Sequence, residues 1–205
     1  MAVDLSKVEN LYSESIKEFG IDAKSVGWGT KVKQDLRFDK LLSVIGESKS
    51  FSINELGCGY GEMVKFCEHN NFNLNRYEGY DISKKMIEAA SNYLINYQNI
   101  HLYNLSEIKN KLNYTISSGI FNVKFDESIK NWEEYIKETL MKMFEKSDKG
   151  IAFNLLSKYV DYKSSNELFY ADPMDYFEFC KKNMSKKVNL LHDYELYEWT
   201  ITVNI

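Results

Sequence analysis

The spacing of hydrophobic positions changes along the chain from a helical to a strand-like period. Over residues 8–19 hydrophobic side chains recur every three to four positions and Gly20 follows, which predicts an amphipathic helix. A similar pattern over residues 36–45, ending at Gly46, predicts a second helix. We therefore expect the first 50 residues to be mainly helical.

From residue 51 onward, strand-like and helical segments alternate. The strand-like segments are FSINEL, RYEGYD, NIHLY, LNYTISS and KGIAFNLL, and helical patterns separate most of them. This alternation predicts a mostly parallel sheet with helices on both faces. The last segment, KKVNLLHDYELYEWTITVNI, holds two strand-like runs with few residues between them, which predicts an antiparallel hairpin.

Composition narrows the class of protein. A chain of 205 residues with 44% hydrophobic and 27% charged residues is typical of one globular domain. Its net charge of −4 gives no overall attraction to polyphosphate, so nucleic acid is a disfavoured partner. No run approaches the roughly 18 apolar residues of a membrane helix, and charges interrupt the N-terminus, which predicts a cytoplasmic protein away from membranes. The three cysteines lack CxxC spacing, so we expect reduced thiols and no metal site.

The segment NELGCGYGEM, residues 54–63, places glycines at alternate positions directly after the first strand. A tight strand-to-helix turn would explain one glycine, but three at the start of a helix favour a ligand-binding loop. The dinucleotide pattern GxGxxG is not met, because Glu62 stands where its third glycine is required. Glu55, just before the loop, disfavours a phosphate group and suits an ammonium group.

Asp81 ends the second strand, about twenty residues beyond the glycines, where dinucleotide-binding folds place a ribose-binding acid. Its two carboxylate oxygens match the two vicinal hydroxyls of a ribose. The alternative is an acidic residue at the start of a helix, stabilised by the helix dipole. The sequence favours a nucleoside-binding role.

Together ELGCGYGEM, YEGYDIS, YTISSGIFN and the terminal hairpin resemble the class I S-adenosylmethionine-dependent methyltransferases over residues 51–205. The resemblance implies an α/β, Rossmann-like seven-stranded sheet of order 3-2-1-4-5-7-6, with strand 7 antiparallel, and S-adenosylmethionine as the cofactor. Many members have an acid near the adenine after strand three, whereas this chain offers Asn104 and Ser106.

The resemblance also implies roles for single residues. The methionine part of the cofactor would face Glu55 and the backbone of Gly57, Cys58 and Gly59; Asp81 would hold the ribose, Ile82 the adenine, and Ser118 and Gly119 would lie near the methyl group. Similar N-terminal segments fold over the cofactor, so residues 1–50 are expected to form a cap on the domain at 51–205. In that cap Trp28, Gln34 and Arg37 would touch the methionine carboxylate or the acceptor, although Arg37 is equally compatible with a surface position.

The acceptor should lie at the carboxyl ends of the later strands, because ligands of open parallel sheets bind there. His192 is the candidate general base, since an imidazole can take up a proton near neutral pH, and Asn122 is the candidate to orient the acceptor. A hairpin cap and a turn residue are the structural alternatives for these two. Tyr159, Tyr170 and Tyr194 are candidate acceptor contacts, and residues 159–172 a candidate lid.

These features predict a methyltransferase that acts on an oxygen or nitrogen of a small molecule. The segments SVGWGT, SGIFN, YADP and LLHDYELYEWT resemble small bacterial methyltransferases of surface-polysaccharide tailoring, which implies a sugar or phosphoramidate group of a capsule as acceptor. A nucleotide-dependent oxidoreductase would require the GxGxxG pattern, and a non-catalytic subunit would be expected to lose the glycines or Asp81. The oligomeric state stays open.

Overall fold

A single mixed sheet organises the computed structural model, which describes residues 3–47 and 50–205. The strands are β1 (Phe51–Leu56), β2 (Leu74–Asp81), β3 (Ile100–Asn104), β4 (Leu112–Ser117), β5 (Ser147–Ser157), β6 (Tyr170–Ala171), β7 (Lys187–Leu191) and β8 (Glu198–Asn204). The α-helices are α1 (Ser6–Phe19), α2 (Lys31–Leu42), α3 (Glu62–His69), α4 (Lys84–Tyr93), α5 (Ile129–Glu145) and α6 (Pro173–Asn183), and the 3₁₀ helices are η1 (Ala23–Val26) and η2 (Ser43–Ile45).

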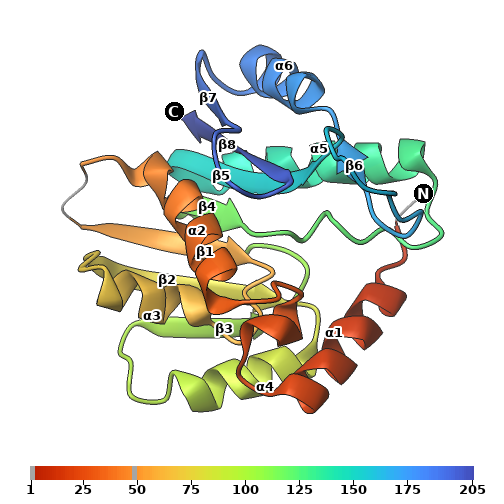
Figure 1. Ribbon diagram of the computed structural model, residues 1–205. Coiled ribbons are helices and arrows are strands. Elements are labelled where there is room, and N and C mark those ends of the chain that lie inside the picture. Colours follow the sequence, from red (N-terminus) through yellow and green to blue (C-terminus); the bar gives the residue numbers. More distant parts are fainter. Residues whose placement is uncertain (1–2, 48–49) are drawn as a thin grey trace.

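The strand order is β3-β2-β1-β4-β5-β8-β7, with β6 pairing with the end of β5 (Figure 1). β8 runs antiparallel to both β5 and β7, and the other strand pairs are parallel. Without the two-residue β6, this is the predicted order 3-2-1-4-5-7-6 with an antiparallel last strand, so the fold prediction is confirmed. The sequence analysis missed β6 because two residues are too few to show a strand period.

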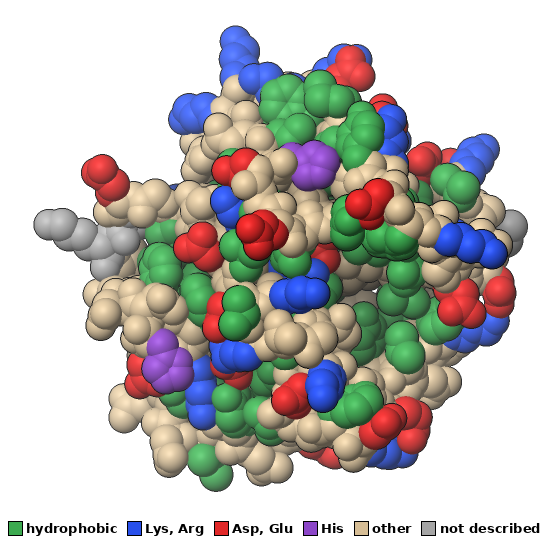
Figure 2. All heavy atoms as spheres, in the orientation of Figure 1, with side chains coloured by type: hydrophobic (Ala, Val, Ile, Leu, Met, Phe, Trp, Pro, Cys, Tyr) green, Lys and Arg blue, Asp and Glu red, His purple; other side chains and the backbone are tan. Residues whose placement is uncertain are grey.

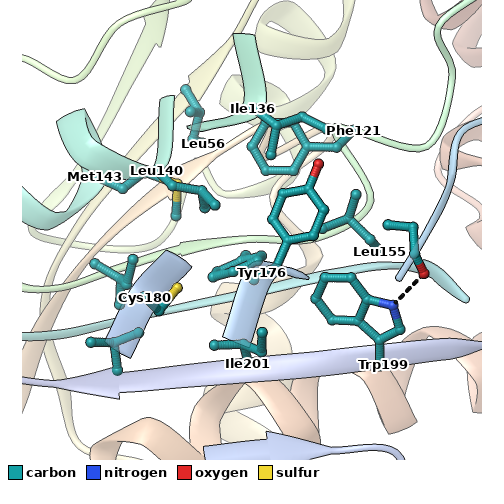
Figure 3. Close-up of a cluster of buried hydrophobic side chains, with 14 of the residues drawn as sticks. Leu56, Phe121, Ile136, Leu140, Met143, Leu155, Tyr176, Cys180, Trp199 and Ile201 are labelled. Carbon is teal, nitrogen blue, oxygen red and sulfur yellow. Dashed lines mark hydrogen bonds between the residues drawn. The ribbon is translucent and has the colours of Figure 1, made fainter. Parts of the chain in front are cut away.

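Hydrophobic residues alternate between the two faces of the sheet, as the period of a strand requires. On β5, Ala152 packs into a cluster with α2 and α3, whereas its neighbour Phe153 packs into a cluster with α5 and α6. In the second cluster Trp199 and Tyr176 are almost fully buried, and Trp199 Nε1 donates a 3.2 Å hydrogen bond to the carbonyl of Ala171 (Figure 3). The helices therefore cover both faces of the sheet.

Polar side chains fix where several helices begin. The side chain of Ser83 accepts a hydrogen bond from the N–H of Met86 at 3.2 Å, which confirms the predicted start of α4. Ser128 caps α5 and Asp172 caps α6 in the same manner. Each side chain satisfies a backbone donor that has no partner within the helix.

Helix α1 packs against α4 and lies at the edge of the sheet where the parallel strands end (Figure 1). The hydroxyls of Ser13 and Ser83 lie 2.8 Å apart in a buried contact between the two helices. α2 instead packs over β5 and β8. Helix α1 and the start of α2 thus lie beside the carboxyl ends of the strands.

No helix in residues 3–47 and 50–205 is long and apolar enough to cross a membrane. Within the same ranges no group of three or more His, Cys, Asp or Glu side chains is arranged to hold a metal ion.

Candidate functional site

A cavity of about 890 Å³, its open mouth included, lies where β1, β2 and β4 end. Helix α1, η1 and the start of α2 bound its other side, and hydrophobic side chains are prominent on this side of the molecule (Figure 2). The residues that line it are Leu5, Val8, Tyr12, Val26, Trp28, Gln34, Phe38, Glu55, Leu56, Gly57, Cys58, Gly59, Tyr60, Glu62, Tyr80, Asp81, Ile82, Met86, Leu105, Ser106, Ser118, Gly119, Ile120 and Tyr135. The cavity thus contains every sequence-predicted cofactor residue except Arg37.

Asp81 joins the glycine loop to the start of α4. Its Oδ2 accepts a hydrogen bond from the N–H of Gly59 at 2.9 Å, and its Oδ1 accepts one from Ser83 at 2.8 Å. Burial raises the pKa of Asp81 to about 6, although these two bonds oppose the rise. Each carboxylate oxygen keeps a further lone pair, so Asp81 can still accept two hydroxyl donors from a ligand.

Glu55 is the most deeply placed acid of the cavity, with 2% of its surface exposed. Burial raises its pKa to about 8, while a 2.5 Å hydrogen bond from the hydroxyl of Tyr77 opposes that rise. An ammonium group beside this carboxyl would favour its charged form. Glu55 can therefore pair with a cationic part of a ligand.

The cavity wall contains acidic side chains but no basic ones. Glu55, Glu62 and Asp81 line the cavity, and none of the residues that line the cavity is Lys, Arg or His. Glu62 accepts a hydrogen bond from Tyr93 at 2.8 Å and pairs with Lys31 at 3.1 Å, which leaves the other two acids without a basic partner among the contacts of the described chain. The wall favours a cation over an anion.

Two polar side chains complete the wall, Ser118 after β4 and Gln34 on α2. The hydroxyl of Ser118 is buried and has no hydrogen-bond partner among the described residues. The side chain of Gln34, 2% exposed, accepts a hydrogen bond from Tyr60 at 3.1 Å. A buried polar atom without a partner is costly, so Ser118 fits a site that a polar ligand completes.

Gly119 is a glycine because Trp28 lies against it. Its φ is +71°, and a Cβ at this position would overlap the indole ring of Trp28. Gly57, with φ of +77°, is restricted in the same way by the side chain of Ile120. Both glycines thus allow a turn after β1 or β4 and also let another side chain pack directly against the backbone.

Arg37 lies behind the cavity wall. Its guanidinium pairs with Glu198 through two hydrogen bonds and lies over the ring of Trp28, 3.9 Å from the ring centroid. The face of the guanidinium that would bind a carboxylate bidentately is occupied by Glu198. Arg37 is therefore buried, which contradicts the surface alternative, and it contacts Trp28, which lines the cavity. The expected contact of Arg37 with the methionine carboxylate or the acceptor stays a prediction.

The predicted acceptor residues lie outside the cavity lining. His192 is exposed after β7, with its ring 6.1 Å from that of Tyr159, which is itself 58% exposed. Tyr170 contacts the ring of Tyr162 in the same region. Aromatic rings of the expected acceptor group thus gather at this part of the sheet edge, but apart from the cavity.

The other two members of the expected group have structural contacts. The side chain of Asn122 is 6% exposed and accepts a hydrogen bond from the N–H of Leu156 at 3.2 Å. The hydroxyl of Tyr194 lies 2.9 Å from that of Thr200. Asn122 ties the turn after β4 to β5, so its contacts match the turn-residue alternative.

The sequence analysis expected residues 1–50 to cap the domain, but it named no cavity residue in or beside α1. Leu5, Val8 and Tyr12 line the cavity at helical spacing, and burial raises the pKa of Tyr12 to about 12, with the charge of Asp81 adding to the rise. Their spacing revealed an amphipathic face but not the surface that this face covers. Leu105 was missed as well, because it follows β3 without any recognisable motif.

The strand order, the glycine turn after β1 and the acid at the end of β2 together define a class I methyltransferase fold. No family model matches the chain. Over 163 residues, covering 79% of the chain and 98% of the relative, it is 37% identical to a protein of Mycobacterium tuberculosis called "Putative methyltransferase Rv1506c".

Two solved structures share the fold at low sequence identity. The magnesium protoporphyrin IX methyltransferase of Synechocystis PCC 6803 with bound S-adenosylhomocysteine has a TM-score of 0.66 and 11% identity, covering 97% of this chain and 94% of that one. The N-methyltransferase NodS of Bradyrhizobium japonicum WM9, also with S-adenosylhomocysteine, has a TM-score of 0.65 and 9% identity, covering 95% and 98%. The chain belongs to the S-adenosylmethionine-dependent methyltransferases.

Proposed function

We propose that the protein transfers a methyl group from S-adenosylmethionine, bound in the cavity, to an oxygen or nitrogen of a small molecule. The observation that carries the proposal is the composition of the cavity wall, which has three acids, no basic side chain and an unpartnered Ser118 hydroxyl. The donor carries an ammonium group, a sulfonium, a carboxylate and a ribose diol but no phosphate. The acids of the wall suit the two cationic groups and the diol, and Gln34 and the backbone N–H groups of the glycine loop are the donors proposed for the carboxylate.

Asp81 and Glu55 divide the polar parts of the donor between them. Asp81 accepts the ribose hydroxyls with the lone pairs that Gly59 and Ser83 leave free. Glu55 pairs with the ammonium group, and the backbone of Gly57 approaches the methionine part. These contacts fix both ends of an elongated ligand across the ends of β1 and β2.

Apolar side chains hold the adenine and keep water out. Ile82 and Leu105, after β2 and β3, supply apolar surfaces for a flat ring, and α1 covers the cavity with Leu5 and Val8. Ser118 and Gly119 lie at the methyl end. When bound, S-adenosylmethionine supplies an electrophilic methyl group, and the wall lowers the barrier chiefly by holding the reacting atoms in line.

The acceptor is proposed to reach the methyl group from the side of β5 and β7. There His192 would remove a proton from an acceptor that is protonated at the working pH, Asn122 would orient it, and Tyr159, Tyr170 and Tyr194 would contact it. A sugar or phosphoramidate group of a capsular polysaccharide is the proposed acceptor class, and its support is the sequence resemblance alone. The acidic residues of the cavity wall support the identity of the methyl donor, not that of the acceptor.

Calorimetry tests the donor. Titration with S-adenosylmethionine and with S-adenosylhomocysteine should give saturable binding, and NAD should give none. Binding of NAD in place of both would favour an oxidoreductase, and binding of none of the three would contradict the proposal.

Replacement of Asp81 tests the ribose contact. Asp81→Ala should weaken S-adenosylhomocysteine binding by about 2 kcal/mol, because charge-assisted hydrogen bonds are lost. Asp172→Ala is the matched control, since Asp172 also accepts a backbone hydrogen bond, from Met174 at 3.0 Å, but caps α6 away from the cavity. Equal affinity of the Asp81 variant and the wild type would remove the assignment.

Acceptors can be screened through the demethylated product. Candidate sugar nucleotides and phosphoramidates are incubated with the donor, and formation of S-adenosylhomocysteine is measured. A compound that raises product formation above the donor-only rate identifies the class. If no sugar or phosphoramidate is methylated but another small molecule is, the proposed acceptor class is wrong, whereas the proposed methyltransferase activity is retained.

A further inference from the structure

A buried ion pair joins the second helix to the last strand. Arg37 donates from Nε to Glu198 Oε2 at 2.9 Å and from Nη2 to Oε1, while its Nη1 donates to the carbonyl of Lys33 at 2.8 Å. Arg37 is 6% exposed and Glu198 1%. A buried pair of this kind contributes little net stability compared with apolar side chains of similar volume, so its presence calls for another explanation.

Asn154 extends this pair to the turn after β4. Its Nδ2 donates to Glu198 Oε2 at 3.2 Å, and its Oδ1 accepts the N–H of Gly119 at 2.7 Å. Asn154 has no exposed surface. The side chain of Asn154 therefore links the carboxylate of Glu198 to the backbone of Gly119, the residue after Ser118.

Trp28 closes the chain of contacts into a ring. One part of its indole lies against Gly119, and the guanidinium of Arg37 lies over the ring, 3.9 Å from its centroid. Trp28 itself is half-buried and lines the cavity. The two wall residues that flank the end of β4, Trp28 and Gly119, are thus both held by the same buried ion pair.

We propose that Arg37, Glu198 and Asn154 are positioning residues that set Trp28 and the Ser118–Gly119 turn in the geometry that binds the methyl end of the donor. The inference rests on the proposed function, because it assigns the donor to this cavity. None of the three touches the cavity, so each acts through Trp28 or Gly119. A lysine at position 37 would keep the charge but lose the planar fork that both pairs with Glu198 and stacks on Trp28.

The test compares Arg37→Lys, Trp28→Ala and the double variant by calorimetry with S-adenosylhomocysteine, well below each melting temperature. Each single variant should weaken binding about tenfold, the loss expected for an interaction of about 1.4 kcal/mol. The double variant should bind as weakly as either single variant, since both changes break the same unit. If Arg37→Lys fails to fold, Asn154→Ala takes its place, because Asn154 lies outside the cavity lining and acts on the wall only through Gly119; it too should weaken binding.

Arg76→Lys is the matched control. Arg76 also pairs with a buried glutamate, Glu78, through two hydrogen bonds, but it lies in the amino-terminal half of β2 and outside the cavity lining. This variant should lower the melting temperature without changing affinity. If Arg37→Lys likewise lowers only the melting temperature, or if the two losses add in the double variant, the positioning role is wrong. Absence of binding by the wild type would instead contradict the proposed function.

Discussion

The carboxyl edge of the sheet has two halves that are built differently. At the ends of β1, β2 and β4 the wall is enclosed, and its acids are fixed by backbone N–H groups and by Tyr77. At the ends of β5, β7 and the loop before β6, aromatic rings are exposed, with Tyr162 at 44% and Tyr197 at 45%, and they contact mainly one another. We call these the donor half and the acceptor half.

The difference follows from how each half is connected. The donor-half residues Gly57, Gly59 and Asp81 lie at or directly after the ends of β1 and β2, which short turns join to α3 and α4, so strand positions determine where these residues stand. The acceptor half is formed largely by residues 158–169, a longer irregular segment that is anchored at Glu167, whose carbonyl accepts the N–H groups of Lys124 and Phe125. A fixed donor half combined with a variable acceptor half allows one fold to serve many acceptors.

The largest effect is expected in the acceptor half and on the rate of transfer. His192→Gln should slow methyl transfer about 100-fold if His192 is the general base, because acid–base catalysis contributes at least that much. Donor affinity, measured by calorimetry, should not change. His69→Gln, at an exposed position in the last turn of α3, is the control. If His192→Gln transfers the methyl group as fast as the wild type, His192 is not the general base.

A smaller effect is expected from filling the close contact in the donor half. Gly119→Ala should weaken donor binding about tenfold, since the added Cβ overlaps Trp28 and forces one of them to shift. Gly46→Ala also places a side chain at positive φ, +57°, but meets no atom within 4 Å, so it should lower only the melting temperature. Similar donor affinity in the two variants would show that the Trp28 contact does not shape the site.

A third comparison concerns the pH dependence of stability, where acids of the two halves should respond oppositely. Burial raises the pKa of Glu55 from its ordinary 4.5 to about 8, so the folded protein keeps a proton that the unfolded chain releases between these values. The free energy of unfolding should therefore fall as the pH rises from about 4.5 to about 8. Urea unfolding at pH 5 and pH 8 should show a smaller fall for Glu55→Gln.

Asp172 gives the contrast. A hydrogen bond from Lys158 lowers the pKa of this half-buried carboxyl below its ordinary 3.8, so its contribution is present above that value and lost as the pH falls. Asp172→Asn should leave the change between pH 5 and pH 8 unaltered. A Glu55→Gln profile identical to that of the wild type would show that Glu55 is ionised in the folded protein near neutral pH.

Most of the fold was predictable because each part of it has a local pattern. β1 was predicted to the residue, and Ser83 was recognised as a cap because a side-chain acceptor is needed at that position. Donor-half residues such as Asp81 follow directly from their strands, so their spacing in the sequence carries their position in space. For these residues the sequence motif predicts the position in the structure, because few residues separate the end of the strand from the cavity.

The buried pairing of Arg37 could not be predicted, for the opposite reason. Its partner Glu198 lies 161 residues away along the chain, and no local pattern indicates that the two meet. Tyr12 was missed because helical spacing shows an apolar face but not what it covers. His192 and Tyr159 do meet, but whether they meet a substrate depends on a loop whose path the sequence does not reveal.

The contact between Arg37 and Glu198 also bears on when the site can form during synthesis. Glu198 stands in β8, the final strand, which inserts between β5 and β7. Until that strand leaves the ribosome, Arg37 has no carboxylate to pair with and Trp28 lacks its support. We therefore expect nascent chains to acquire the glycine loop early and the finished methyl-end wall last, so that an incomplete polypeptide binds the cofactor more weakly than the finished protein.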